Sequence, residues 1–251
     1  METVQLQFPA GRISSILCVC AVGWLALSAA AEPVTLFYEN RAPFMVVQNG
    51  ELVGTEGKTA ADTFKAAGVA FTLSEAPGAR QIEMVGKNLS PSCAIGLYWT
   101  AERARVGKYT LPIYRSQSQD LVMRTDNPKF QSIDSMRFLL ADPEVSLALR
   151  NGYSYGSNMD ALLSHAKARL KRPPEDSRGR IKMVLEGMAD GALFTHDEAA
   201  YQIGQFGADG KVLAIRHFSD TPPGVPSYLY CSNSVDDELI GRLNKVLKKR
   251  H

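Results

Sequence analysis

A threonine and an arginine stand three residues apart just after a short apolar run of the sequence. The run, residues 94–97, is typical of a buried strand. The residues that follow it are aromatic and then polar: Tyr98, Trp99, Thr100 and, three positions on, Arg103. Open α/β sheets bind ligands at the carboxyl ends of their strands, and a guanidinium matches a carboxylate with two parallel hydrogen bonds. The stretch therefore predicts recognition of a small anion, with a solvated turn as the alternative.

A second polar turn, residues 152–156, reads Gly-Tyr-Ser-Tyr-Gly and lies between a predicted strand and a predicted helix. Backbone N–H groups and a hydroxyl at a helix start make an anion site. The same letters match the nucleophile elbow of α/β-hydrolases, and Asp190 or Asp197 and then His217 follow in the hydrolase order. No HGGG-type segment precedes Ser154, and little chain separates Asp197 from His217. The anion site is therefore favoured over a serine hydrolase.

The first 31 residues have the pattern of a cleaved leader. Arg12 precedes an uncharged apolar run at residues 13–27, and the small residues at 28–31 favour cleavage before Glu32. The run is too short and wrongly flanked for a good membrane span. The sequence therefore predicts a signal peptide at residues 1–31 and an exported mature protein.

Two cysteines, Cys93 and Cys231, remain in the mature chain. We predict a disulfide between them because exported proteins meet an oxidising compartment; two buried thiols are the alternative. The histidines show no metal-ligand spacing, so we expect neither a metal nor a cofactor. The net charge of +2 and the dispersed basic residues argue against a nucleic-acid partner.

Strand and helix patterns alternate along the mature chain. The main predicted strands lie at residues 34–38, 69–73, 94–97, 119–124, 145–149, 191–194, 212–218 and 228–231. The main predicted helices lie near residues 60–67, 78–85, 159–170, 181–188 and 198–203, with a last one after Ser234. Such alternation implies an α/β fold with parallel sheets, and the Pro-rich segment 221–226 is a stiff linker before the tail.

Six short motifs occur in an order that is specific for one fold, although each is weak alone. They lie at residues 41–54, 64–69, 96–103, 112–114, 152–156 and 185–191. With them, essentially the whole mature chain resembles the periplasmic solute-binding proteins of the type 2 fold. The resemblance is to the polar amino-acid class of ABC transporter receptors, solute-binding protein family 3.

The resemblance implies a two-lobed α/β fold, in which each lobe is a mostly parallel sheet flanked by helices and two crossover strands join the lobes. Lobe 1 would comprise residues 32–115 and 221–251, and lobe 2 residues 116–220. It also implies a monomeric, non-enzymatic periplasmic protein that binds a small polar, carboxylate-bearing solute between the lobes. The partner would be the membrane permease of an ABC transporter.

The resemblance also implies roles for individual residues. Arg103 would clamp the ligand carboxylate with Thr100 beside it, and the turn 152–154 would contact the ligand from lobe 2. In the family an acidic residue after the strand at 191–194 usually contacts the ligand amine. Asp197 is the nearest acidic residue here, although the register from Asp190 places Thr195 at that position. The full expected ligand-binding set is Tyr38, Arg41, Arg80, Tyr98, Trp99, Thr100, Arg103, Gly152, Tyr153, Ser154, Thr195 and Asp197.

The chain departs from the family pattern in its charges. Amino-acid receptors commonly carry an aromatic residue where this chain has Arg41. If Arg41, Arg80 and Arg103 all face inward, the cleft is strongly cationic, which favours an anionic or carboxylate-rich solute over a neutral amino acid.

Two alternatives stay open beside transport. A dehydratase-like enzyme on the same fold would need a general acid or base, for which Glu39, Glu56 and Glu102 are candidates, although we expect all three in surface turns. A receptor that reports its ligand to a membrane signalling protein would need the same closing motion.

Overall fold

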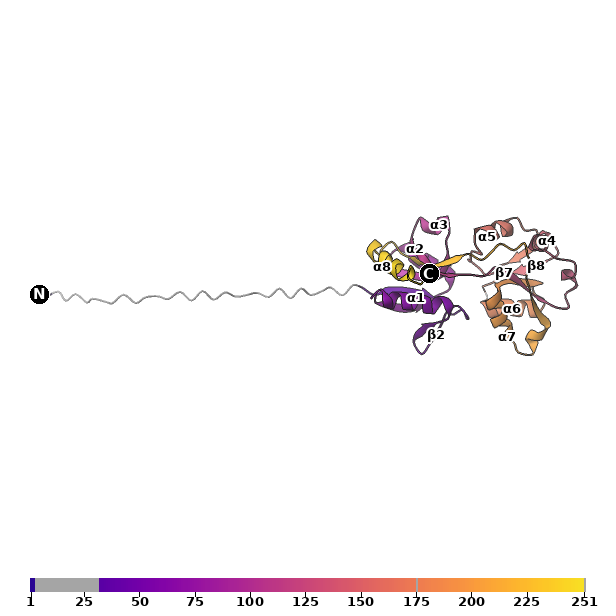
Figure 1. The fold of residues 1–251 in the computed structure, drawn as a ribbon, viewed down its shortest axis with the longest axis horizontal. Helices are drawn as coiled ribbons and strands as arrows, with labels where there is room; N and C mark the ends of the chain where they lie inside the picture. The colour runs from indigo at the N-terminus through magenta and orange to yellow at the C-terminus, as the bar shows by residue number, and fades with distance from the viewer. Residues whose placement is uncertain (3–31, 175, 251) are drawn as a thin grey trace. The chain divides into compact units, whose positions relative to one another are not determined.

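The computed structural model describes residues 1–2, 32–174 and 176–250. The predicted signal peptide therefore lies outside the described residues except for its first two. From Glu32 onward the chain forms one compact unit with two five-stranded sheets and a two-stranded hairpin (Figure 1). The predicted α/β fold is confirmed. Within the described ranges no helix is both long enough and apolar enough to cross a membrane.

The first sheet and its helices are called lobe 1 below. Its strand order is β4-β1-β5-β12-β6. The strands are β1 (Val34–Tyr38), β4 (Phe71–Glu75), β5 (Ser92–Tyr98), β6 (Lys108–Arg115) and β12 (Pro226–Cys231). The helices are α1 (Thr55–Ala66), α2 (Gly78–Lys87), α3 (Ala101–Ala104) and α8 (Asp237–Leu247), and the hairpin is β2 (Val46–Gln48) with β3 (Glu51–Val53). A core around Phe64 and Leu243 joins α1 and α8 to one face of this sheet.

The second sheet and its helices are called lobe 2. Its strand order is β11-β7-β10-β8-β9. The strands are β7 (Gln119–Arg124), β8 (Ser146–Ala148), β9 (Arg169–Lys171), β10 (Gly191–Thr195) and β11 (Leu213–Arg216). The helices are η1 (Pro128–Phe130), α4 (Met136–Ala141), α5 (Ser157–Ser164), α6 (Ser177–Leu185), α7 (His196–Gly204) and η2 (Asp209–Val212).

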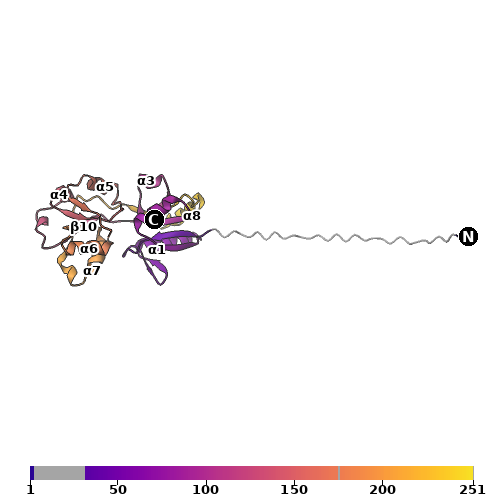
Figure 2. The same ribbon diagram turned by 180° about the vertical axis from the view of Figure 1, so that it is seen from behind.

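Alternating residues of the strands bury both faces of the second sheet. Leu121 packs with the α4 and α5 cluster, whereas its neighbour Val122 packs with the α6 and α7 cluster. Figure 2, seen from behind, shows α4 and α5 together on one side of this sheet and α6 and α7 on the other. The helix predicted at 159–170 is shorter than expected because the backbone N–H groups of Lys167 and Ala168 bond to Leu140 of α4, and β9 follows.

Each sheet is mixed: it contains both parallel and antiparallel pairings. In the first, β1 pairs parallel with β4 and β5, whereas β12 runs antiparallel to β5 and β6. The second likewise has two parallel and two antiparallel pairings. The chain passes from the first sheet to the second after β6 and returns before β12. The first strand after each crossing, β7 in the second sheet and β12 in the first, runs opposite to the other strands of its sheet, which the alternating pattern does not reveal.

The two crossing segments bond to each other. The Ser116 backbone N–H donates to the Val225 carbonyl at 3.0 Å, and the Val225 N–H donates to the Ser116 hydroxyl at 3.1 Å. A Cβ on Gly224 would lie 1.9 Å from the Ser116 carbonyl oxygen, so this close approach requires glycine. The strand order supports lobe boundaries near residues 115 and 220, which remain a proposal.

The predicted disulfide is confirmed. Cys93 on β5 and Cys231 on β12 face each other in adjacent strands, both fully buried, and their sulfur atoms are bonded. The bond links positions that are 138 residues apart in the sequence.

Candidate functional site

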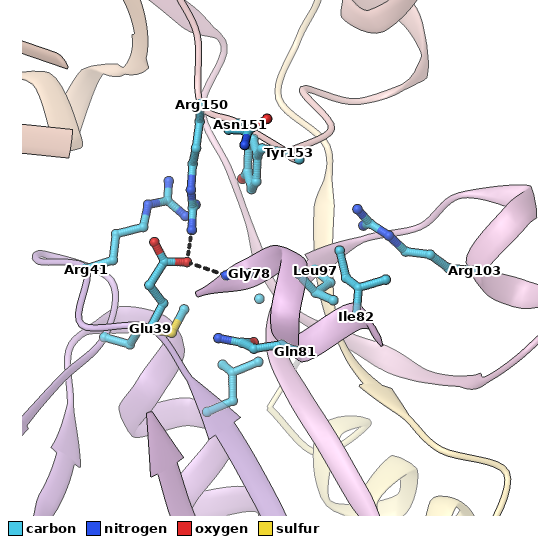
Figure 3. Close-up of a pocket in the computed structure, with 14 residues that line it drawn as sticks. Glu39, Arg41, Gly78, Gln81, Ile82, Leu97, Arg103, Arg150, Asn151 and Tyr153 are labelled. Atoms are coloured by element: carbon cyan, nitrogen blue, oxygen red, sulfur yellow. Dashed lines mark hydrogen bonds and ion pairs between the residues drawn. The ribbon is translucent and has the colours of Figure 1, made fainter. Parts of the chain in front are cut away.

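A small cavity lies between the two lobes, where residues after β1, on α2, on β5 and after β8 meet (Figure 3). Its charged lining consists of Glu39, Arg41 and Arg103 from lobe 1 and Arg150 from lobe 2. Neighbouring hollows share part of this lining: one runs toward Glu75 and Asp176, and another runs toward Thr100, Ser154 and Arg172. The cavity and these hollows together form a polar groove between the lobes.

Arg103 is held at the edge of the cavity by the end of β5. Thr100 caps α3, because its hydroxyl accepts a hydrogen bond from the Arg103 backbone N–H at 3.2 Å. The Arg103 guanidinium donates to the Tyr98 carbonyl at 2.9 Å, and the Tyr230 hydroxyl donates to the Arg103 carbonyl at 3.1 Å. Among the described residues, Arg103 forms no ion pair. Its side chain is thus oriented while its charge stays available.

Arg41, in contrast, is neutralised across the lobes. Its guanidinium forms two parallel hydrogen bonds with the Glu198 carboxylate, at 3.0 and 2.7 Å, and both side chains are buried. The Arg41 guanidinium also lies over the rings of Phe44 and Tyr153, 4.5 and 5.4 Å from their centres. Planar stacking of this kind suits arginine. The Arg41–Glu198 ion pair therefore lies between the lobes, where the sequence predicted an unpaired Arg41.

Residues of lobe 2 hold the Glu198 carboxylate in place and keep it ionised. The Ser177 hydroxyl donates to the carboxylate at 2.6 Å, and the buried Arg180 guanidinium donates to the Ser177 oxygen at 3.2 Å. Burial alone would raise the pKa of Glu198, but Arg41, Arg180 and the hydrogen bonds outweigh it and lower that pKa to about 2. The group is therefore a carboxylate throughout the physiological range.

This low pKa predicts a loss of stability in acid. Because the pKa of Glu198 is lower in the folded than in the unfolded chain, its contribution is complete above about pH 5 and disappears as the pH falls toward 2, an effect of about 3 kcal/mol. Urea unfolding across this range measures the effect, and Glu198→Gln should lack this part of the pH dependence. The prediction fails if the wild-type and Glu198→Gln proteins lose stability in parallel.

A second ion pair joins the lobes at the mouth of the cavity. The Arg150 guanidinium contacts the Glu39 carboxylate, which also accepts the Gly78 backbone N–H at 3.1 Å (Figure 3). The Arg150 guanidinium lies 4.7 Å from the centre of the Tyr153 ring. Two of the three guanidinium groups that line the cavity are therefore paired with glutamate from the opposite lobe.

Glu56 is buried, not in a surface turn as expected. It follows Gly54 at the start of α1, and one of its carboxyl oxygens accepts a hydrogen bond from the Ser227 hydroxyl. Gly96, at φ +75°, faces it closely: a Cβ there would lie 2.5 Å from the other Glu56 oxygen. Burial raises the pKa of Glu56. Of the other two candidate acids, Glu102 is exposed and Glu39 is half-buried.

The structure gathers most of the predicted ligand-binding residues along the groove or beside it. Six of them line it: Arg41, Thr100, Arg103, Gly152, Tyr153 and Ser154. Two more, Tyr98 and Thr195, line an adjoining small cavity that also has Arg41 and Tyr153 in its wall. Four are not brought there. Arg80 pairs with Glu83 on the exposed face of α2, and Trp99 is 54% exposed. The Tyr38 hydroxyl bonds to Glu75, and Asp197 is exposed at the start of α7.

The polar groups of the turn at 152–156 form hydrogen bonds with α5, the helix that follows it. The Ser154 hydroxyl donates to the Asp160 carboxylate, which also accepts the Tyr155 backbone N–H at 2.8 Å. The Gly156 N–H donates to the Ser154 oxygen at 3.2 Å. Asp160 thus takes the place predicted for an external anion, which sequence reasoning did not foresee.

The serine, histidine and aspartate residues considered for a hydrolase do not form a triad. His217 and His196 each contact the buried carboxylate of Asp120 through Nδ1, at 2.8 and 2.9 Å, whereas Ser154 bonds to Asp160. Within the described part of the chain, no group of three histidine, cysteine or acidic side chains is placed to hold a metal ion.

Four charged residues of the site, Glu39, Glu56, Arg150 and Glu198, were not in the predicted ligand-binding set. For Glu198 a signal existed, since it lies in the first turn after β10, one position beyond Asp197. Arg150 lies two positions after the end of β8 and precedes the glycine turn. Its partner Glu39 lies 111 positions away in the sequence, and no local pattern pairs the two.

Comparison with known proteins agrees with this architecture. A search of curated protein sequences finds no match. Among solved structures, EhuB in complex with hydroxyectoine is similar with a TM-score of 0.70 and 17% identity, over 86% of this chain and 82% of that one. A periplasmic His/Glu/Gln/Arg/opine family-binding protein from Silicibacter pomeroyi, in complex with lysine, gives a TM-score of 0.65 and 19% identity over 86% and 89%.

A third similar structure is the ancestral amino acid-binding protein AncCDT-1, a precursor of cyclohexadienyl dehydratase. It gives a TM-score of 0.62 and 20% identity over 86% of this chain and 88% of that one. At these identities the structures show the fold alone. The family is shown by a sequence model that matches residues 34–251. The chain belongs to family 3 of the bacterial extracellular solute-binding proteins.

Proposed function

We propose that this protein binds a small solute with a single carboxylate between its lobes, in the periplasm, and delivers it to the permease of an ABC transporter. Family membership supports a binding role outside the cytoplasm. The similar structures include proteins whose ligands are lysine and hydroxyectoine, both of which carry a carboxylate.

The observation that carries the proposal is the state of the three guanidinium groups lining the cavity. Arg41 and Arg150 are paired with Glu198 and Glu39, whereas Arg103 has no acidic partner among the described residues. Arg80, the third arginine of the strongly cationic cleft expected from the sequence, lies outside it. One available guanidinium favours a single carboxylate, and this replaces the carboxylate-rich solute suggested by the sequence.

Arg103→Gln should abolish most of the affinity. Loss of charge-assisted hydrogen bonds to a carboxylate costs about 2 kcal/mol or more, which is about 30-fold in Kd. Arg103→Lys keeps the charge but not the two-pronged geometry and should fall between. The measurement is calorimetric titration of amino acids, monocarboxylates and dicarboxylates, chosen with the help of mass spectrometry of molecules released from gently purified protein.

Arg105→Gln is the matched control, because Arg105 is exposed at the end of the same short helix and lines none of the cavities described. Tighter binding of dicarboxylates than of monocarboxylates, or an Arg103→Gln protein that binds as well as the control, would contradict the proposal. Delivery is tested separately: deletion of the gene should abolish uptake of the bound solute by intact cells, whereas a signalling receptor would leave uptake unchanged.

A further inference from the structure

A second small cavity adjoins the first and shares Arg41 and Tyr153 in its lining. Both lobes line it: Glu56, Tyr98 and Tyr114 come from lobe 1, and Thr195 comes from lobe 2. Two polar atoms at this cavity have no hydrogen-bond partner among the described residues. They are the second carboxyl oxygen of Glu56 and the hydroxyl oxygen of Thr195, and both residues are only 3% exposed.

Unpartnered polar groups of this kind are uncommon in protein interiors. Each lowers the stability of the folded protein when its water is removed and nothing replaces it. Glu56 is already anchored through its other oxygen by Ser227, and Gly96 leaves the free oxygen against bare backbone. Thr195 ends β10 immediately before α7, yet its hydroxyl makes no capping bond to that helix. The second oxygen of Glu56 and the Thr195 hydroxyl therefore make no hydrogen bond to the described residues around them.

The charges around the cavity decide what could satisfy these atoms. The Arg41 guanidinium lines the same cavity, but its charge is balanced by the Glu198 carboxylate, so the pair favours neither a cation nor an anion there. Burial also raises the pKa of Glu56, which favours a protonated carboxyl group able to donate a hydrogen bond. A neutral group that both donates and accepts, such as a hydroxyl or a primary amide, fits all of these conditions.

We propose that Glu56 and Thr195 form a second subsite that takes a hydroxyl or amide group of the solute whose carboxylate binds Arg103. The inference rests on the proposed function and refines it. The two cavities share Arg41 and Tyr153 in their linings, so separation of the lobes would let one small molecule reach both. The solute class is then a monocarboxylate with a neutral polar group at its other end.

The test is a calorimetric titration of matched acids of increasing length. The series compares glycolate, β-hydroxypropionate, γ-hydroxybutyrate and δ-hydroxyvalerate with the same acids lacking the hydroxyl, and it includes succinamate and γ-aminobutyrate. At the length that spans both subsites, we expect the hydroxyl or amide compound to bind at least about tenfold more tightly than its unsubstituted acid. The ammonium compound should gain nothing.

Thr195→Val should bring the affinity of the hydroxyl or amide compound close to that of its unsubstituted acid, so the ratio of the two dissociation constants is the quantity to compare with the wild type. The substitution should also stabilise the solute-free protein, because an unsatisfied buried hydroxyl is replaced by a methyl group. Thr221→Val is the matched control: the Thr221 hydroxyl is likewise buried and unpartnered, but it lines neither cavity. Glu56→Gln, which keeps a neutral hydrogen-bonding group, should retain binding better than Glu56→Met.

The possible outcomes distinguish failure of the subsite from failure of the proposed function. If unsubstituted acids bind through Arg103 and the hydroxyl adds nothing at any length, the subsite is refuted and the proposed function stands. If Thr221→Val lowers the gain as much as Thr195→Val does, the subsite is also refuted. If no carboxylate of the series binds, both the proposed function and the subsite fall.

Discussion

Glu198→Gln is expected to lower the free energy of unfolding by about 3–5 kcal/mol at neutral pH, because it leaves the buried Arg41 guanidinium without its countercharge. The mutation keeps the shape of the side chain and one hydrogen-bond acceptor, so the loss reports the charge. Urea unfolding measures it. Asp197→Asn is the matched control, since that neighbouring carboxylate is exposed, and it should change stability by less than about 0.5 kcal/mol.

The same pair joins the two lobes, so its loss should also favour their separation. Small-angle X-ray scattering of the solute-free Glu198→Gln protein should give a larger radius of gyration than that of the wild type. A double variant, Arg41→Met with Glu198→Leu, should recover most of the stability, since apolar residues of similar volume often replace a buried ion pair without loss. A stable, compact Glu198→Gln protein would show that the pair does not hold the lobes together.

Loss of the Cys93–Cys231 bond is expected to have the other large effect. A crosslink between positions 138 residues apart restricts the unfolded chain strongly. The chain-entropy argument gives about 5 kcal/mol for such a loop, and removal of native disulfides typically costs about 2–5 kcal/mol. Urea unfolding with and without a reductant measures the difference.

The double variant Cys93→Ala with Cys231→Ala supplies the control for that experiment. It should unfold at the same urea concentration whether or not the reductant is present, and at about the same concentration as the reduced wild type. A wild-type protein whose unfolding free energy changes by less than about 1 kcal/mol on full reduction would contradict the prediction.

Local sequence was informative wherever a residue's position depends on its immediate neighbours. Arg103 lies where it was expected because strand, cap and helix follow one another within a few residues, and the hydroxyl of Thr100 orients the turn. The prediction that Arg80 faces the ligand was wrong, also for a local reason. Arg80 forms an ion pair with Glu83, three positions on in the same helix.

The charge of the site could not be predicted because it depends on contacts between distant segments. Arg41 and Glu198 are 157 positions apart, and their pairing requires the two lobes to meet. On α7, each residue turns the side chain by about 100°. Moving one position from Asp197 to Glu198 therefore exchanges an exposed carboxylate for a buried one, and only the start of the helix after β10 decides between them.

The place of β12 has a consequence for how the protein is made. Among the described residues this strand is the last in chain order, yet it lies between β5 and β6 in its sheet. A nascent chain that ends before it would leave Cys93 as an unpaired thiol and the facing edges of β5 and β6 open to other chains. All strands of lobe 2 lie within residues 119–216, so the sheet of lobe 2 can form before β12 is available. A chain truncated before β12 should therefore aggregate through the exposed edges of β5 and β6, so correct assembly of lobe 1 depends on this strand.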